Sequence, residues 1–223
     1  CSNFSATIFR FNQSKMNYIF TRPAWQLAIV SGLCVGIAYQ PWHLGFLVYI
    51  GFIPLIHVWF THNTKNNFKS GYIFGLVYNL ISNYWIGANS GAEFGVVLFS
   101  LISAVMYLAL FWGIAGAITG ALRKDVNLYL MLPFLVVSLE WIRSFGPLGF
   151  AWGNLALTQT DYLPILQNID IAGTYYIAFW IISINVILYN LIYSKTGIKK
   201  AHIIPAIIFL GLFFSGWGRM QFF

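Results

Sequence analysis

The feature that most constrains this chain is a succession of long apolar runs that contain almost no charged residues. A membrane-spanning helix needs about 20 consecutive apolar residues, and within a bilayer a helix pairs all of its own backbone polar groups. The runs are continuous and do not alternate with a period of two, which favours helices over strands. We therefore predict an all-α polytopic membrane protein, a bundle of about seven transmembrane helices at residues 23–39, 44–60, 71–89, 94–122, 128–146, 170–193 and 201–217.

The composition indicates that lipid, rather than water, covers most of the surface. Hydrophobic residues make up 59% of the chain and charged residues only 8%, against about 25% charged residues in an average soluble domain. We predict one transmembrane helical domain at residues 22–223, preceded by a lead-in at 1–21 that is poorly ordered or interfacial. Because the chain begins at Cys1 and not at a methionine, we expect a fragment or a processed product.

The net charge of +7 reflects membrane topology, not nucleic-acid binding, because the basic residues stand in small groups at the ends of the apolar runs. If the amino terminus is cytoplasmic, ten of the twelve basic residues are cytoplasmic and only Arg143 and Arg219 lie outside. A bias of this kind sets the orientation of membrane proteins. With an odd number of spans, we predict a cytoplasmic N-terminus and a periplasmic C-terminus. The ten cytoplasmic residues are Arg10, Lys15, Arg22, Lys65, Lys69, Arg123, Lys124, Lys195, Lys199 and Lys200.

Two polar and aromatic clusters, both on the predicted outer side, are the candidates for a functional site. Glu140 and Arg143 stand three residues apart on one helix face. Ionisable residues within a span are costly and suggest function, but such a pair can also neutralise itself and only stabilise the bundle. After Arg143 the helix is interrupted by proline and glycine. The second cluster, which includes Tyr84 and Trp85, lies at the end of the third predicted span, 71–89. The candidate lipid-facing or structural residues are Glu140, Arg143, Gly149, Phe150, Trp152, Asn154, Tyr84 and Trp85.

No catalytic residue, metal site or cofactor is expected in this chain. Cys34 lies in an apolar run with no base near it in the sequence, so we interpret it as a packing residue. Glycines four residues apart, such as Gly71 and Gly75, predict close helix packing. The histidines are too scattered for a metal site: His43, His57, His62 and His202.

Several motifs together resemble a known family. E-W-I-R at 140–143 is followed by L-G-F-A-W-G-N at 148–154, and then by T-Q-T-D-Y-L-P-I-L-Q-N-I-D at 158–170. G-I-A-Y-Q-P-W-H-L at 36–44 is similar to the family's first hairpin. On these motifs the chain, from about Arg22 to Phe223, resembles the membrane domain of the bacterial apolipoprotein N-acyltransferases. It departs from the family pattern at Ala151, where proline is usual.

The resemblance implies an enzyme that moves an acyl chain from a phospholipid to the diacylated N-terminal cysteine of a lipoprotein, in the bacterial inner membrane. In the family, a thioester forms on a cysteine, and the Glu, Lys and Cys of the catalytic triad lie in a nitrilase-like domain on the outer face. That domain would begin where this chain stops, so no catalytic residue is carried over and the chain alone is expected to be inactive. The implied partners are a phospholipid acyl donor, a diacylated lipoprotein acceptor, the lipid bilayer and the nitrilase-like domain.

Two other classes of membrane protein remain as alternatives. A small polytopic transporter would be expected to show repeats and a polar site at mid-membrane, whereas the polar groups here gather at one surface. A non-catalytic membrane scaffold is also compatible with a chain that carries no triad. Whether Glu140 and Arg143 bind substrate or only stabilise the bundle is left open by the sequence.

Overall fold

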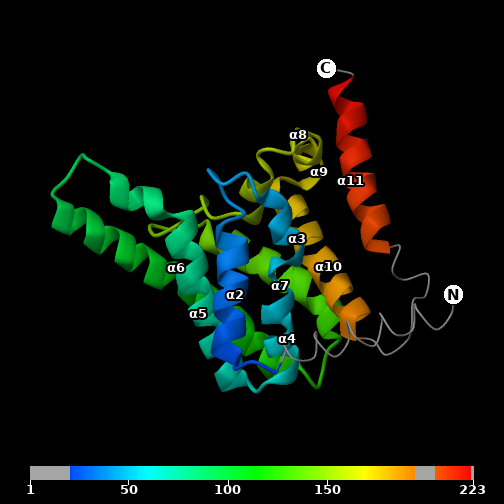
Figure 1. Ribbon diagram of the computed structural model, residues 1–223, viewed down its shortest axis with the longest axis horizontal. Coiled ribbons are helices and arrows are strands. Elements are labelled where there is room, and N and C mark those ends of the chain that lie inside the picture. Colours follow the sequence, from blue (N-terminus) through cyan, green and yellow to red (C-terminus); the bar gives the residue numbers. More distant parts are fainter. Residues whose placement is uncertain (1–20, 194–203, 222–223) are drawn as a thin grey trace, which may run out of the picture.

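The computed structural model describes residues 21–193 and 204–221, and these residues form helices, turns and loops with no strand. The prediction of an all-α protein is thereby confirmed for the described part of the chain. Most of the lead-in predicted at 1–21, the basic residues at 195–200 and the first residues of the span predicted at 201–217 lie outside the described residues. Figure 1 shows the arrangement of the helices.

The helices follow the apolar runs, with short 3₁₀ segments (η) and one-turn helices between them. They are α2 (Ala24–Gly36), η1 (Gly45–Leu47), α3 (Val48–Gly51), α4 (Ile53–Thr61), α5 (Thr64–Ser82), η2 (Tyr84–Ala88), α6 (Phe94–Leu122), α7 (Leu128–Arg143), η3 (Leu155–Gln159), α8 (Leu163–Leu166), α9 (Ile169–Ala172), α10 (Thr174–Tyr193) and α11 (Ile204–Met220).

The helix α5 begins seven residues before the apolar run that predicted it. The side chain of Asn63 accepts a hydrogen bond of 2.9 Å from the backbone N–H of Asn66 and so caps the helix at a polar position. Asn127 caps α7 in the same way, through the backbone N–H of Tyr129 at 3.0 Å. Side-chain caps satisfy backbone donors that a helix start leaves unpaired, so polar residues extend or start these helices outside the apolar pattern.

Within residues 21–193 and 204–221, two helices, α6 and α10, are long and apolar enough to cross a membrane. Shorter apolar helices are α2, the Gly45–Thr61 segment and the Ile207–Met220 part of α11. In the most apolar 18-residue stretch of α6, only 28% of the residues are buried. Phe94 and Phe99 are 75% and 73% exposed. Soluble proteins rarely expose apolar patches of this extent. The surface of α6 is therefore suited to contact with lipid.

The apolar run at 44–60 is not one straight helix, because a side chain of α10 interrupts it. Asn185, fully buried, accepts a hydrogen bond of 3.0 Å from the Phe52 N–H and donates one of 2.8 Å to the Val48 carbonyl. These two backbone groups would pair with each other in a continuous α-helix. Insertion of a side chain into this ladder is a recognised cause of kinks, and it divides the run into α3 and α4.

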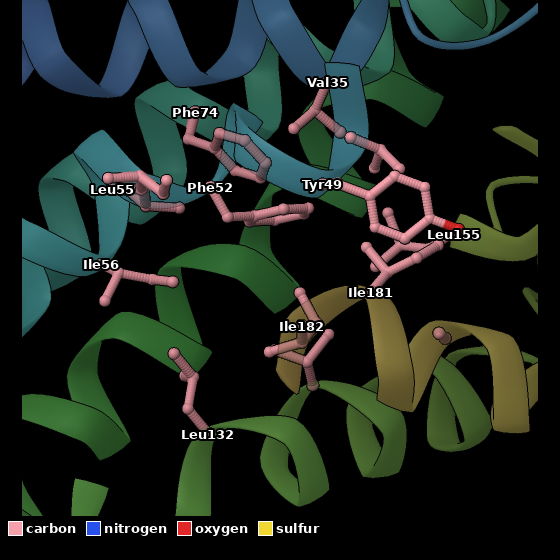
Figure 2. Packing of buried hydrophobic residues seen from close by; sticks show 14 of the residues in the cluster. Val35, Tyr49, Phe52, Leu55, Ile56, Phe74, Leu132, Leu155, Ile181 and Ile182 are labelled. Carbon is pink, nitrogen blue, oxygen red and sulfur yellow. The ribbon is translucent and has the colours of Figure 1, made fainter. Parts of the chain in front are cut away.

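The core lies where α2, α3, α4, α5, α7 and α10 meet. Figure 2 shows Phe52 and Phe74 at its centre, with Ile181 and Ile182 of α10 below them. The helices α5 and α6 pack closely against each other, because a Cβ atom on Gly71 would lie only 2.2 Å from the Trp112 carbonyl oxygen. The prediction that the paired glycines serve close packing is confirmed at this interface.

The described charges are distributed unequally between the two ends of the bundle. The start of α5, which includes Lys65, and the α6–α7 connection, which includes Arg123 and Lys124, lie at the lower end in Figure 1, and α8 and α9 lie at the upper end. At that upper end Arg219 of α11 forms an ion pair with Asp170 of α9. The segment from 144 to 173 folds as turns and short helices across this end of the bundle.

Candidate functional site

The last turns of α7 carry a buried acid–base pair. Glu140 and Arg143 are only 4% and 3% exposed, and the Arg143 Nη2 atom lies 3.8 Å from Glu140 Oε1. This distance allows a strong charge–charge attraction inside the protein but no direct hydrogen bond between the two groups. The hydrogen bonds of the carboxylate are therefore made elsewhere.

Glu140 holds the loop that returns over the end of the bundle. Its Oε1 atom accepts a hydrogen bond of 3.0 Å from the Leu155 N–H, and its Oε2 atom accepts one of 3.1 Å from Asn154 Nδ2. The other end of the Asn154 amide caps η3, because its Oδ1 atom accepts a bond of 2.9 Å from the Ala156 N–H. The carboxylate thus fixes the position at which η3 begins.

Two tyrosines from other helices complete this buried network. The hydroxyl groups of Tyr39, just after α2, and Tyr78, on α5, lie 2.8 Å apart. Tyr78 donates a bond of 2.7 Å to the Gly153 carbonyl, and the Tyr39 hydroxyl lies 3.0 Å from the Asn154 carbonyl. The guanidinium of Arg143 lies 3.4 Å from the place that a Cβ atom on Gly153 would take. Glycine at 153 therefore lets the loop approach the charge closely.

The network is closed to molecules larger than water. A cavity lined by Glu140, Arg143 and Trp112 has a volume of about 10 Å³, which is about the minimum for a single water molecule. Both charged side chains are almost fully buried, so a lipid phosphate does not reach Arg143 in this structure. In this structure Glu140, Arg143 and Asn154 are buried, and their contacts support this end of the bundle.

The exposed candidates gather beside this network. The rings of Trp85, in η2, and Trp152 are 5.3 Å apart, and Trp152 is 66% exposed. Tyr84 and Trp85 are 47% and 44% exposed, and Phe150 is half-buried. The two clusters, predicted separately, are thus brought together, with the aromatic rings on the surface next to the buried polar groups.

A tight turn explains how α7 leads into the exposed aromatic residues. The helix ends at Arg143, three residues before Gly146, which has a positive φ of 84°. The Gly149 N–H bonds to the Gly146 carbonyl at 2.9 Å, and the Phe150 N–H bonds to the Arg143 carbonyl at 2.8 Å. A Cβ atom on Gly149 would lie 2.7 Å from the Ser144 carbonyl oxygen. The turn therefore requires glycine at position 149.

The sequence did not predict the contacts between the segment at 158–161 and the segment at 43–49. The Gln159 amide donates to the Gly45 carbonyl at 3.1 Å and accepts from the Tyr49 hydroxyl at 3.0 Å. Asp161 pairs with His43 at 3.0 Å. These side chains come from distant parts of the sequence. The only signal in the sequence for such contacts is that Tyr39, Tyr78 and Gln159 carry polar groups in a largely apolar chain.

Among residues 21–193 and 204–221, no group of three or more His, Cys, Asp or Glu residues could hold a metal ion. Cys34 is a half-buried free thiol on α2.

Comparisons with known proteins agree with the arrangement. Residues 31–187 match the sequence model of the apolipoprotein N-acyltransferase N-terminal domain. The apolipoprotein N-acyltransferase of Geobacter metallireducens is 30% identical over 176 residues, which are 77% of this chain and 34% of that protein. The enzyme of the same name from Thermotoga maritima is 25% identical over 206 residues, 83% of this chain and 38% of that protein. The chain spans about a third of the length of these curated relatives.

Proposed function

We propose that this chain, which belongs to the apolipoprotein N-acyltransferase family, is the membrane part of an enzyme that transfers an acyl chain from a phospholipid to the N-terminal diacylglyceryl-cysteine of lipoproteins. The match lies in the family's N-terminal domain and covers about a third of the relatives. The acyl transfer itself is assigned to the part of the enzyme that the match does not cover. The chain alone is proposed to transfer no acyl group.

The proposed topology is a bundle of about seven spans in the bacterial inner membrane, with the N-terminus in the cytoplasm. It is supported by the predicted ten-to-two division of basic residues between the two sides. It is also supported by the gathering of Lys65, Arg123 and Lys124 at one end of the bundle. The opposite end, which carries Trp85 and Trp152, is then periplasmic.

The observation that carries this proposal is the contact between Trp85 and Trp152 on top of the closed Glu140 network. Tryptophan and tyrosine are favoured at the level of lipid headgroups. We assign to Tyr84, Trp85, Phe150 and Trp152 the contact with the phospholipid and with the lipid anchor of the acceptor. Glu140, Arg143 and Asn154 are positioning residues that hold the Trp152 loop at this level.

A chimera tests the proposal. This chain would replace the matched third of the Geobacter metallireducens relative, in a bacterium depleted of its own apolipoprotein N-acyltransferase. We expect the chimera to restore N-acylation of a reporter lipoprotein, measured by mass spectrometry of its N-terminal peptide, and the chain alone to restore none. A well-inserted chimera with no activity, or an active chain alone, would contradict the proposal.

A matched pair of variants tests the aromatic contact. Trp152→Ala in the chimera should raise the phospholipid concentration needed for half-maximal acylation, whereas Trp217→Ala, 51% exposed on α11, should leave it nearly unchanged. Equal effects of the two substitutions would refute the assignment to the outer aromatic cluster.

A further inference from the structure

Another pocket lies at the opposite, basic end of the bundle, away from the Glu140 network. It has a volume of about 300 Å³ and lies between the start of α2 and the first turns of α5, within the range of small-molecule sites, roughly 300–1,000 Å³. Its wall on α5 consists of Asn66, Lys69, Ser70 and Ile73. These residues are spaced three, four and seven apart and so share one face of the helix.

The register of α2 and α5 creates this pocket. Gly32 packs against Val77 and Gly36 against Ile81, so the two helices run in the same direction with a constant offset. At this offset, the start of α2 lies level with Lys69. Because α5 begins at Thr64, it extends past α2 by about five residues, or roughly 7 Å. The face with Asn66 and Lys69 therefore borders the N-terminal end of α2.

A helix N-terminus and two basic side chains make the pocket electropositive. The N-terminus of α2 has no side-chain cap and no acidic residue in its first turn, and a helix N-terminus carries a partial positive charge. The side chains of Lys69 and Asn66 form no ion pair or hydrogen bond within the described chain, so their side-chain N–H groups are available to a ligand. Arg123 adds a charge nearby, because its guanidinium donates to the His62 carbonyl at 3.0 Å and His62 lines the pocket.

The remaining lining residues limit what can bind. Ser70 is 1% exposed and its hydroxyl already donates to the Asn67 carbonyl at 3.0 Å, so among the lining residues of α5 the side-chain donors that remain are Lys69 and Asn66. No acidic residue lines the pocket. Trp25 is 52% exposed at its rim, as expected of a tryptophan at the level of lipid headgroups. An anion with several acceptor oxygens fits these groups best.

We propose that this pocket binds a phosphate group, carried either by an anionic phospholipid headgroup or by a soluble phosphate compound. Lys69 supplies the charge, Asn66 a second donor and the start of α2 a favourable dipole. The site is independent of the acyl transfer proposed above, because it lies at the other end of the bundle from Trp152.

The test uses the purified chain in micelles of a nonionic detergent, at constant ionic strength. Native mass spectrometry would measure the retention of dioleoyl-phosphatidylglycerol and dioleoyl-phosphatidylcholine, and calorimetry the binding of inorganic phosphate. Lys69→Gln should weaken binding about tenfold or more, as expected when a charge-assisted hydrogen bond is lost. Asn66→Ala should weaken it in the same direction. Lys65→Gln is the matched control, since Lys65 is on the same helix but does not line the pocket.

The two sources of phosphate give different results. Phosphatidylglycerol retention that depends on Lys69, without saturable binding of inorganic phosphate, would support the site and identify a lipid headgroup. Saturable phosphate binding that depends on Lys69 would support the site and identify a soluble ligand. If Lys69→Gln and Asn66→Ala behave like Lys65→Gln with every probe, or if no probe binds, the proposal is wrong.

Discussion

The buried pair on α7 allows the structural account to be tested in free-energy terms. The Glu140→Gln substitution removes the charge that compensates Arg143, and Arg143→Met removes the charge that compensates Glu140. Because both side chains are at most 3% exposed, each single substitution strands a buried charge, at a cost of about 3–5 kcal/mol. The double substitution strands none. Glutamine can still accept from the Leu155 N–H, so the double variant should lose less than about 2 kcal/mol.

The free energy of unfolding would be measured by reversible denaturation with sodium dodecyl sulfate in mixed micelles, followed by tryptophan fluorescence. The coupling energy between the two positions should then be about 4 kcal/mol or more. Arg219→Met is the control, since the Arg219–Asp170 pair is at the same end but 33% and 60% exposed, and exposed pairs contribute about 0–1 kcal/mol. A double variant that loses the sum of the two single losses would refute the view that the pair acts as one buried unit.

Three further predictions rest on other contacts. Asn185→Leu should destabilise the chain by about 2–6 kcal/mol, because the Val48 carbonyl and the Phe52 N–H lose their partner and each buried group left unpaired costs roughly 1–3 kcal/mol. Unfolding measurements with the exposed Asn190→Leu variant as control would check it. Gly75→Val should cost at least about 1–3 kcal/mol, since its Cβ would lie 2.7 Å from Ala109 Cα, whereas Gly95→Val meets open space; equal losses would contradict the packing. Cys34→Ala should leave stability within about 1 kcal/mol and chimera activity unchanged, and mass spectrometry should find no acyl thioester on Cys34.

The sequence was informative where local pattern decides the structure. Apolar runs of membrane length predicted helices, and α6 has the bounds of its run. The spacing of Glu140 and Arg143 placed them on one helix face, and interfacial preference placed Trp85 and Trp152 at the same end. These inferences need only helical periodicity and the chemistry of single residues, so they do not depend on knowing which helices are neighbours.

The sequence was not informative where one side chain completes the backbone of another element. Asn185 kinks a helix 133 residues away, and its own surroundings are an ordinary apolar run. Tyr39, just after α2, and Tyr78 of α5 both bind the Gly153 loop. Because this loop encloses Arg143, a residue that could have bound lipid phosphate is instead buried. Such pairings follow from tertiary packing, which local periodicity does not specify.

The central claim is that the basic end of the bundle is cytoplasmic and the end with Trp85 and Trp152 is periplasmic. Single cysteines would be placed, in a Cys1→Ser, Cys34→Ser background, at the exposed positions Lys65, Lys124, Ser90 and Leu148. Intact spheroplasts would then be treated with a membrane-impermeant maleimide. We expect labelling at 90 and 148 in intact spheroplasts, and labelling at 65 and 124 only after the membrane is permeabilised. Labelling of 65 and 124 in intact spheroplasts would contradict the claim.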